Sequence, residues 1–338
     1  MKRLLLSAAL AIVAVPSHAQ TRNEMITGIV VDHVLAGVDT LAAQTAKLDE
    51  TARSDCDPAS QTLRSRYSEA FDAWLAVSHL RFGPTEVGDR AFALAFWPDS
   101  RGATPRALAS LMSAQDPVAQ NADAYAQVSI AARGFYAMEL LLFDETTTSG
   151  ANHEYLCTLV RTVAADIANN SAAIAQNWQT DYAAALLEPA VQGVYRSDDE
   201  VLQELFKALA TGLQFTSETR LGRPLGTYDR PRPARAEAWR SGRSARNVAL
   251  SLEALRDLAR HLSANDADLS ARIEGRFNKA VIQLSDLKDP IFAGVSAPQT
   301  RLKVEVLQQS VGAIRALVTE ELGPTLGVAA GFNALDGD

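Results

Sequence analysis

Apolar residues recur at intervals of three and four along most of this chain, and this spacing constrains the fold more than any other feature. Between residues 61 and 80, one face of a helix is marked by Leu63, Tyr67, Ala70, Trp74 and Val77. This helix is expected to end near Gly83 and Pro84, because both residues break helices. The same spacing predicts four more helices, at residues 156–178, 201–213, 252–262 and 304–317. The sequence therefore predicts an all-α fold built from helical bundles.

The composition agrees with a helical fold. Aromatic residues make up 7% of the 338 residues, and 19 Gly and 13 Pro are few for a sheet protein full of tight turns. With 47% hydrophobic residues the chain can bury a sizeable core, and its length fits two domains. The net charge of −8 argues against a general binder of nucleic acid or of anionic membranes.

The first 19 residues have the pattern of a secretory signal peptide. Lys2 and Arg3 form a basic start, residues 4–15 are apolar, and Ser17 and Ala19 supply small residues before a cut at Gln20. No later apolar run reaches the roughly 18 residues that a membrane span needs. We therefore expect an exported, periplasmic protein with no transmembrane segment in the mature chain.

The chain has two cysteines, Cys56 and Cys157. In an oxidising compartment such a pair predicts a single disulfide, which here would join distant segments. Two separate buried thiols are the alternative, because sequence spacing does not establish geometry.

Helix breakers cluster in three segments, at residues 81–105, 144–152 and 220–246. The first and the last are long loops, which in compact domains are usually functional. A domain boundary is expected near residues 188–198, where Ser197 is also a good helix N-cap. The predicted organisation is a signal peptide, an N-terminal helical-bundle domain and a C-terminal helical-bundle domain, at residues 1–19, 20–190 and 191–338.

The segment from Arg133 to Asp144 is the most informative for function. It is apolar all round except for Tyr136 and Glu139, which stand three residues apart and share a helix face. A buried carboxylate is costly unless it is paired, protonated or bound to a metal. Glu139 is therefore a candidate site residue together with Tyr136. Alternatively, it is a core carboxylate neutralised by an arginine such as Arg133 or Arg81.

Charged residues in the long loops are further candidates. The segment 81–105 presents Arg81 and Asp99 on irregular backbone, where binding groups are often found, although solvated loop charge is the alternative. The segment 220–246, which we call the arginine-rich loop, holds eight arginines, no lysine and two acids, Asp229 and Glu237. Arginine without lysine suits bidentate binding of carboxylates or phosphates, which belong either to a ligand or to the protein itself.

Catalytic signatures are sparse. The histidines of the mature chain are isolated in sequence, with no HExxH motif, no two-histidine helical pair and no phosphate-binding glycine loop: His33, His79, His153 and His261. His79, beside Arg81, is the only one near a candidate site, and a half-exposed surface position is expected for it. Standard zinc hydrolase chemistry is therefore not supported.

Several separated motifs occur in order along nearly the whole mature chain. They are Trp74, Arg81–Pro84, Trp97–Pro98, Arg133–Glu139, Leu141–Phe143, Pro224–Gly226, Glu237, Ser241, Ser244, Leu326–Val328, Gly331–Asn333 and Asp336–Asp338. Together they resemble the imelysin family, exported bacterial proteins named for a proposed peptidase and often associated with iron uptake. The resemblance implies two helical-bundle domains with a site between them.

The family's signature is GxHxxE, which Gly134 and Glu139 match while Tyr136 takes the histidine position. A phenol must lose a proton of pKa about 10 before it ligates a metal well, which favours a strongly acidic cation such as Fe(III) over Zn(II). The resemblance thus implies where the site lies, and the tyrosine argues against metal-dependent peptidase activity.

We therefore expect a binding protein without hydrolytic activity, associated with iron or haem-related uptake, whose small ligand or metal ion sits between the two bundles. Tyr136 and Glu139 are the candidate metal ligands, and iron is the candidate cofactor. The expected ligand-binding residues are Tyr136, Glu139, Arg81, Asp99, Glu237, Ser241, Arg243 and Ser244. A periplasmic or outer-membrane partner protein fits an exported protein, whereas nucleic acid does not.

Two alternatives stay open. One is a metallopeptidase in which Glu139 polarises metal-bound water and His79 completes the metal shell. The other is an anion or partner-protein binder that uses the arginine-rich loop without a metal.

Overall fold

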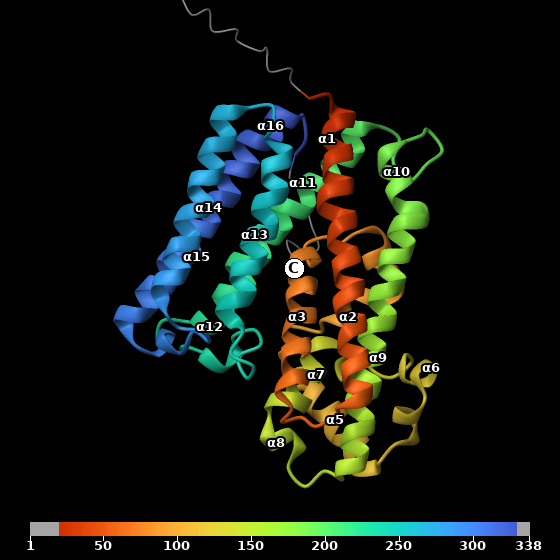
Figure 1. Ribbon diagram of the computed structural model, residues 1–338. Coiled ribbons are helices and arrows are strands. Elements are labelled where there is room, and N and C mark those ends of the chain that lie inside the picture. Colours follow the sequence, from red (N-terminus) through yellow and green to blue (C-terminus); the bar gives the residue numbers. More distant parts are fainter. Residues whose placement is uncertain (1–19, 330–338) are drawn as a thin grey trace, which may run out of the picture.

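The computed structural model describes residues 20–329, and every regular element in this range is helical. Residues 1–19, which are predicted to be a signal peptide, and the motifs after residue 329 lie outside the described residues. Two groups of long helices stand side by side (Figure 1). The predicted all-α fold is confirmed.

The first group contains the long helices from the N-terminal half of the chain. They are α1 (Arg22–Gly28), α2 (Ala36–Ser54), α3 (Gln61–Val77), α9 (His153–Asn177) and α10 (Ala183–Leu187). A π-helical turn joins α1 to α2, and another joins α9 to α10, at Ile29–Leu35 and Trp178–Tyr182. Since α2 packs against both α3 and α9, it forms the spine of this group.

The second group contains the helices that follow. They are α11 (Asp198–Gln214), α12 (Gly222–Leu225), α13 (Ser244–Leu262), α14 (Ala267–Leu287), α15 (Pro298–Leu317) and α16 (Gly323–Leu326). π-Helical turns again join α11 to α12 and α15 to α16, at Phe215–Leu221 and Val318–Leu322. The two groups meet where α3 packs against α13 and where α1 packs against α11. Residues 188–197, where a domain boundary is expected, connect the groups without a helix.

The helices marked by apolar spacing appear as α3, α9, α11, α13 and α15. Ser197 caps α11 as predicted, because its side chain accepts a hydrogen bond from the backbone N–H of Glu200. The helix α14 was not among the predicted ones, although Leu269, Ile273 and Phe277 have the same spacing and are buried.

Short elements fill the breaker-rich segments. They are α4 (Arg90–Leu94), α5 (Ala103–Ala114), α6 (Ala122–Tyr125), α7 (Gly134–Phe143) and α8 (Glu145–Thr148), with 3-10 turns at Gly83–Thr85, Val87–Asp89, Pro117–Gln120, Ile130–Ala132, Pro233–Arg235 and Ala293–Ser296. Figure 1 shows α5, α7 and α8 in the lower part of the first group, below the level of α12.

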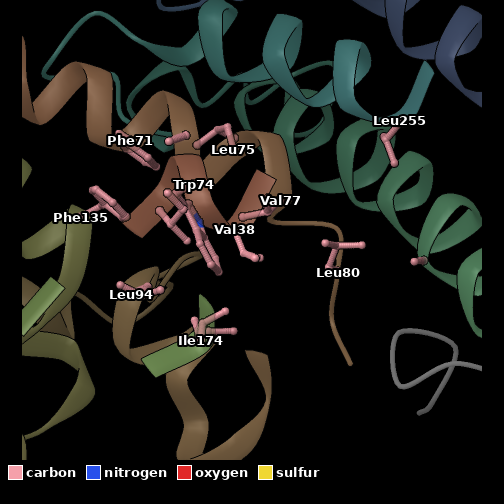
Figure 2. Packing of buried hydrophobic residues seen from close by; sticks show 14 of the residues in the cluster. Val38, Phe71, Trp74, Leu75, Val77, Leu80, Leu94, Phe135, Ile174 and Leu255 are labelled. Atoms are coloured by element: carbon pink, nitrogen blue, oxygen red, sulfur yellow. The ribbon is translucent and has the colours of Figure 1, made fainter. Parts of the chain in front are cut away.

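The core of the first group is organised around α3. Trp74 lies at the centre of the cluster in Figure 2, with Val38 of α2 and Ile174 of α9 nearby. The rings of Phe71 and Phe135 stack at a centroid distance of 4.8 Å, which ties α7 to α3. Because α7 is held by this core, the residues it carries are fixed in position.

One helix in the described part of the chain, Arg22–Ser54, is long and apolar enough to cross a membrane by length and composition alone. The sequence prediction of no such segment overlooked it, because polar residues interrupt its apolar run. In the structure Ile26, Ile29 and Leu41 are buried against neighbouring helices, so this is a core helix of the first group.

Cys56 and Cys157 form the predicted disulfide, with their Cα atoms 5.1 Å apart. The bond joins the segment after α2 to the first turns of α9. The alternative of two separate thiols is therefore wrong.

Candidate functional site

The helix α7 places Tyr136 and Glu139 in the interior, and all its residues except Phe143 are buried. It begins at Gly134, whose φ is +75°. A Cβ atom at this position would lie 2.2 Å from the carbonyl oxygen of Leu94. Only glycine fits here, because any larger residue would be strained and would push α4 away.

Tyr136 is part of a buried polar network that crosses from one helical group to the other. Its hydroxyl donates a hydrogen bond to Oε1 of Glu237, and Nε of Arg220 donates to Oε2 of Glu237 at 2.8 Å. Arg220 also donates to the hydroxyl of Ser251 at 3.0 Å. The exposed fractions of Tyr136, Glu237 and Arg220 are 8%, 2% and 5%. Burial, with the nearby charge of Glu237, holds the pKa of the Tyr136 phenol well above its ordinary value.

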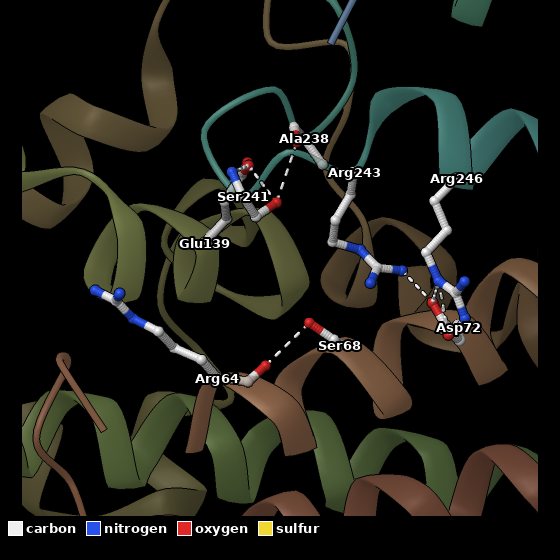
Figure 3. Close-up of polar contacts among 8 residues, drawn as sticks. All are labelled: Arg64, Ser68, Asp72, Glu139, Ala238, Ser241, Arg243 and Arg246. Atoms are coloured by element: carbon white, nitrogen blue, oxygen red, sulfur yellow. Dashed lines mark hydrogen bonds and ion pairs between the residues drawn. The ribbon is translucent and has the colours of Figure 1, made fainter. Parts of the chain in front are cut away.

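Glu139 is held by Ser241 of the arginine-rich loop. The backbone N–H and the hydroxyl of Ser241 donate to Oε1 of Glu139 at 2.9 and 2.8 Å (Figure 3). Burial raises the pKa of Glu139, and the two hydrogen bonds oppose that rise. Neither arginine considered as its partner is bonded to it, because Arg133 pairs with Asp166 and Arg81 pairs with Glu86.

A cavity of about 190 Å³ lies between α7, the segment before α5 and the arginine-rich loop. Its walls are formed by aromatic, small and charged residues: Phe96, Trp97, Asp99, Gly102, Thr104, Pro105, Tyr136, Glu139, Leu140, Arg223, Ala234, Arg235, Ala236, Ala238, Trp239 and Arg240. The peptide bond between Trp97 and Pro98 is cis. Three predicted site residues, Tyr136, Glu139 and Asp99, therefore line one cavity, with Glu237 and Ser241 bonded directly to two of them.

Asp99 forms part of the wall but is engaged with backbone. Oδ1 accepts from the N–H of Ala103 at 2.9 Å, and Oδ2 accepts from the N–H of Thr104 at 2.8 Å. Partial burial alone would raise the pKa of Asp99, yet these hydrogen bonds hold it below its ordinary value. Asp99 is thus an anion that fixes the start of α5.

Three of the predicted site residues lie elsewhere. Arg81 is half exposed in its ion pair with Glu86 and does not line the cavity. Arg243 is buried and reaches Asp72 of α3, as Figure 3 shows. Ser244 is buried beside it in the first turn of α13, and its hydroxyl has no hydrogen-bond partner among the described residues.

The eight arginines of the arginine-rich loop divide into two sets. Four pair with acids of the protein, as one alternative expected: Arg220 with Glu237, Arg240 with Asp144, and Arg243 and Arg246 with Asp72. The other four have no acidic partner among residues 20–329: Arg223, Arg230, Arg232 and Arg235. Of these, Arg223 and Arg235 line the cavity.

The half-exposed surface position expected for His79 is wrong, and two histidines that are isolated in sequence meet in the fold. His33 and His79 are buried, and their Nε2 atoms lie 2.8 Å apart. Nδ1 of His33 is 2.8 Å from Oδ2 of Asp257. Burial, with His33 and Arg220 nearby, holds the pKa of His79 well below its ordinary value. No sequence signal could reveal this chain, since its members are 46 and 224 residues apart.

Within residues 20–329, no group of three or more His, Cys, Asp or Glu side chains could hold a metal ion. Tyr136 and Glu139 share the cavity wall, but burial holds the pKa of the Tyr136 phenol well above its ordinary value, and Oε1 of Glu139 already accepts two hydrogen bonds from Ser241. Their chemistry does not fit direct ligation of a bare cation.

A model of the Imelysin family matches residues 34–318. The chain belongs to the imelysin family. Its GxHxxE-like segment, with Tyr136 in the histidine position, is the start of α7. The resemblance drawn from the separated motifs is thereby confirmed. A comparison with curated proteins gave no match.

Two solved structures share the imelysin fold of this chain. An imelysin-like protein from Psychrobacter arcticum 273-4 has a TM-score of 0.80 at 21% identity, over 95% of this chain and 100% of that one. A putative iron-regulated protein A precursor from Parabacteroides distasonis ATCC 8503 has a TM-score of 0.74 at 10% identity, over 89% and 96%. At these identities the likeness shows the fold alone.

Proposed function

We propose that this imelysin-family chain is an exported binding protein of iron-related uptake, and that its ligand occupies the cavity described above. The observation that carries the proposal is the origin of the cavity walls. Tyr136 and Glu139 come from the N-terminal half, whereas Arg223 and Trp239 come from the C-terminal half. Cavities at such junctions are common places for small-molecule sites.

The role in iron uptake and the export rest on other support. The Parabacteroides distasonis protein with the same fold is described as a putative iron-regulated protein A precursor. The sequence pattern of residues 1–19 is that of a signal peptide, which would direct the mature chain to the periplasm.

Binding accounts for the site better than hydrolysis. A metallopeptidase of the expected type needs Glu139 and His79 together around one metal-bound water. Glu139 instead accepts both hydrogen bonds of Ser241, and His79 is hydrogen-bonded to His33. The proposed function therefore has no hydrolytic step.

Iron in such a protein would arrive with ligands of its own. To ligate iron, the Tyr136 phenol would have to give up its hydrogen bond to Glu237 and lose its proton. Burial opposes this loss, because it raises the pKa of the phenol. The cavity instead presents two unpaired arginines, which suit the outer anionic groups of a complex.

The experiment that tests the proposal is native mass spectrometry with elemental analysis on protein purified from its own periplasm. We expect about one equivalent of a small molecule or iron complex per chain. Ala234→Trp should abolish this retention, because Ala234 is exposed and lines the cavity. Ala59→Trp, at an exposed turn outside the cavity, is the matched control and should retain the ligand.

Retention unchanged in Ala234→Trp would place the ligand elsewhere, and an empty wild-type protein would remove the binding function. Chelator-sensitive turnover of an unstructured polypeptide would favour the peptidase instead.

A further inference from the structure

The charges that face the cavity favour an anionic ligand. Arg223 and Arg235 line it, and neither has a hydrogen-bonded or ion-paired acid among the described residues. The carboxylates in the wall are engaged already: Asp99 accepts from two backbone N–H groups, and Glu139 accepts from Ser241. The charged side chains that remain unpaired in the wall are therefore both cationic.

Arg223 is held against an aromatic wall. Its guanidinium carbon lies 5.8 Å from the ring centroid of Trp97, and Trp97 stacks on Tyr136 at 6.3 Å. Nε of Arg223 is buried without a hydrogen-bond partner. Burial, followed by the charge of Arg235, lowers the pKa of Arg223, which is the mark of a cation without a counter-charge. A guanidinium held on a ring offers its donors as a preorganised fork.

Positive charge continues outside the cavity. Arg230 is exposed without an acidic partner among residues 20–329, and Arg232 is close to it. The charge of Arg230, then burial and the charge of Arg235, lower the pKa of Arg232, so the three guanidinium groups lie near enough to repel one another. In a chain of net charge −8, this local excess attracts anions towards the site.

We propose that the cavity binds a small organic polycarboxylate, free or as its ferric chelate, through Arg223 and Arg235, with Trp97 and Trp239 covering the carbon skeleton of the ligand. The inference rests on the proposed function, namely that this cavity is the ligand site. Carboxylate oxygens are hard ligands that suit Fe(III), so the same groups can bind iron and contact arginine. The volume of the cavity is about 190 Å³, below the roughly 300 Å³ at which pockets for drug-sized ligands begin. This volume favours a small ligand.

Isothermal titration calorimetry on the mature protein tests the inference with citrate, ferric citrate, inorganic phosphate, glycerol and Zn(II) as probes. Citrate or ferric citrate is expected to bind, and its affinity should fall as salt is raised. If citrate binds and ferric citrate does not, the ligand is a free polycarboxylate. If only ferric citrate binds, the ligand is a chelate. Glycerol and Zn(II) should give no binding heat.

Variants decide whether the two arginines are responsible. Arg235→Gln and Arg223→Gln should each weaken binding about tenfold, which is the usual worth of a hydrogen bond to a charged group. Arg235→Lys keeps the positive charge but lacks the paired donors of the guanidinium group, so it should weaken binding less than Arg235→Gln does. Arg66→Gln, at a half-exposed position of α3 outside the cavity, is the matched control and should bind as the wild type does. Because Arg235 is exposed, its variants should fold normally, and thermal unfolding checks this.

Three results would overturn the inference: no heat with either citrate probe, wild-type affinity for citrate in both glutamine variants, or phosphate bound as tightly as citrate. If the wild-type protein nevertheless retains its native ligand and Ala234→Trp does not, only the assignment of the ligand as a polycarboxylate fails. If no native ligand is found, the proposed function fails with it.

Discussion

At the scale of single residues, the exchange of histidine for Tyr136 changes what the signature segment can do. A neutral imidazole accepts a metal, whereas this phenol donates a hydrogen bond to Glu237, whose charge Arg220 balances. The network therefore ties α7 to the arginine-rich loop. Tyr136 acts here as a buried donor that shapes the cavity wall.

Glu139→Gln should alter the free energy of unfolding by no more than about 1 kcal/mol at pH 7, since an amide oxygen can still accept both hydrogen bonds of Ser241. Burial raises the folded-state pKa of Glu139, so the wild-type chain loses stability as pH rises from the unfolded pKa through the folded one. The variant lacks this loss, so its stability relative to the wild type should rise as pH rises above the unfolded pKa of about 4.3. Urea unfolding of both proteins across this range measures it.

Ser241→Ala is the companion variant and should cost about 1 kcal/mol, because one buried hydrogen bond disappears while the backbone N–H of Ser241 still donates. A loss of several kcal/mol in Glu139→Gln would mean that the negative charge of Glu139 balances buried arginines.

The histidine pair predicts a second pH effect. Because burial lowers the folded-state pKa of His79, the unfolded chain binds a proton below pH ~6.5 while the folded chain does not. Stability should fall as pH drops below that value, by up to about 1.4 kcal/mol per pH unit. The carboxylate of Asp257, whose pKa the His33 hydrogen bond lowers, titrates in a separate, more acidic window.

Urea unfolding at pH 7.5 and 5.5 measures this effect. His79→Gln should flatten the difference, and His153→Gln, an exposed control, should leave it unchanged. An equal pH dependence in all three proteins would assign the effect to other groups.

At the scale of elements, α3 connects the two helical groups through one carboxylate. Asp72 accepts hydrogen bonds from Arg243 and Arg246 at the start of α13, as Figure 3 shows. Partial burial would raise the pKa of Asp72, but the two arginines hold it below its ordinary value. The buried Arg243 forms no other ion pair among the described residues, so Asp72 is its direct counter-charge.

Asp72→Asn should therefore lower the free energy of unfolding by about 2 kcal/mol, since it leaves the charge of Arg243 buried and uncompensated. Glu69→Gln on the same helix breaks only an exposed pair with Arg66 and should cost less than about 0.5 kcal/mol. Denaturant unfolding of the two variants compares them directly. Equal small losses would show that apolar packing alone joins α3 to α13.

The sequence predicted the elements with unequal success, for physical reasons. Three-and-four spacing located α3 or α9 because each buries one continuous face, a local property. The short helices α4, α6 and α8 span only five, four and four residues, which is too short for such a spacing to show. The arginine-rich loop was recognisable by composition, but which arginines remain unpaired depends on acids such as Asp72 and Asp144, far away in sequence.

At the scale of the whole molecule, the site depends on both helical groups holding their relative position. Tyr136 and Glu139 were predictable because a carboxylate in an apolar helix must be satisfied. Trp97 and Arg223, which also line the cavity, carry no such local signal and become neighbours only when the groups meet. The cavity is therefore a property of the assembled fold, and anything that loosens one group should loosen the site.

The disulfide supplies the last prediction. Cys56 and Cys157 are separated by 101 residues, and closing a loop of this length restricts the unfolded chain by roughly 4 to 5 kcal/mol in the chain-entropy model. Removing the bond in Cys56→Ser/Cys157→Ser should cost about 2 to 4 kcal/mol, because α2 and α9 also pack directly against each other. Urea unfolding of this variant and of the oxidised wild type measures the difference, and thiol titration of the denatured, unreduced wild type should find no free thiol. Two free thiols would contradict the bond, and an unchanged unfolding midpoint would mean that packing alone holds the first group together.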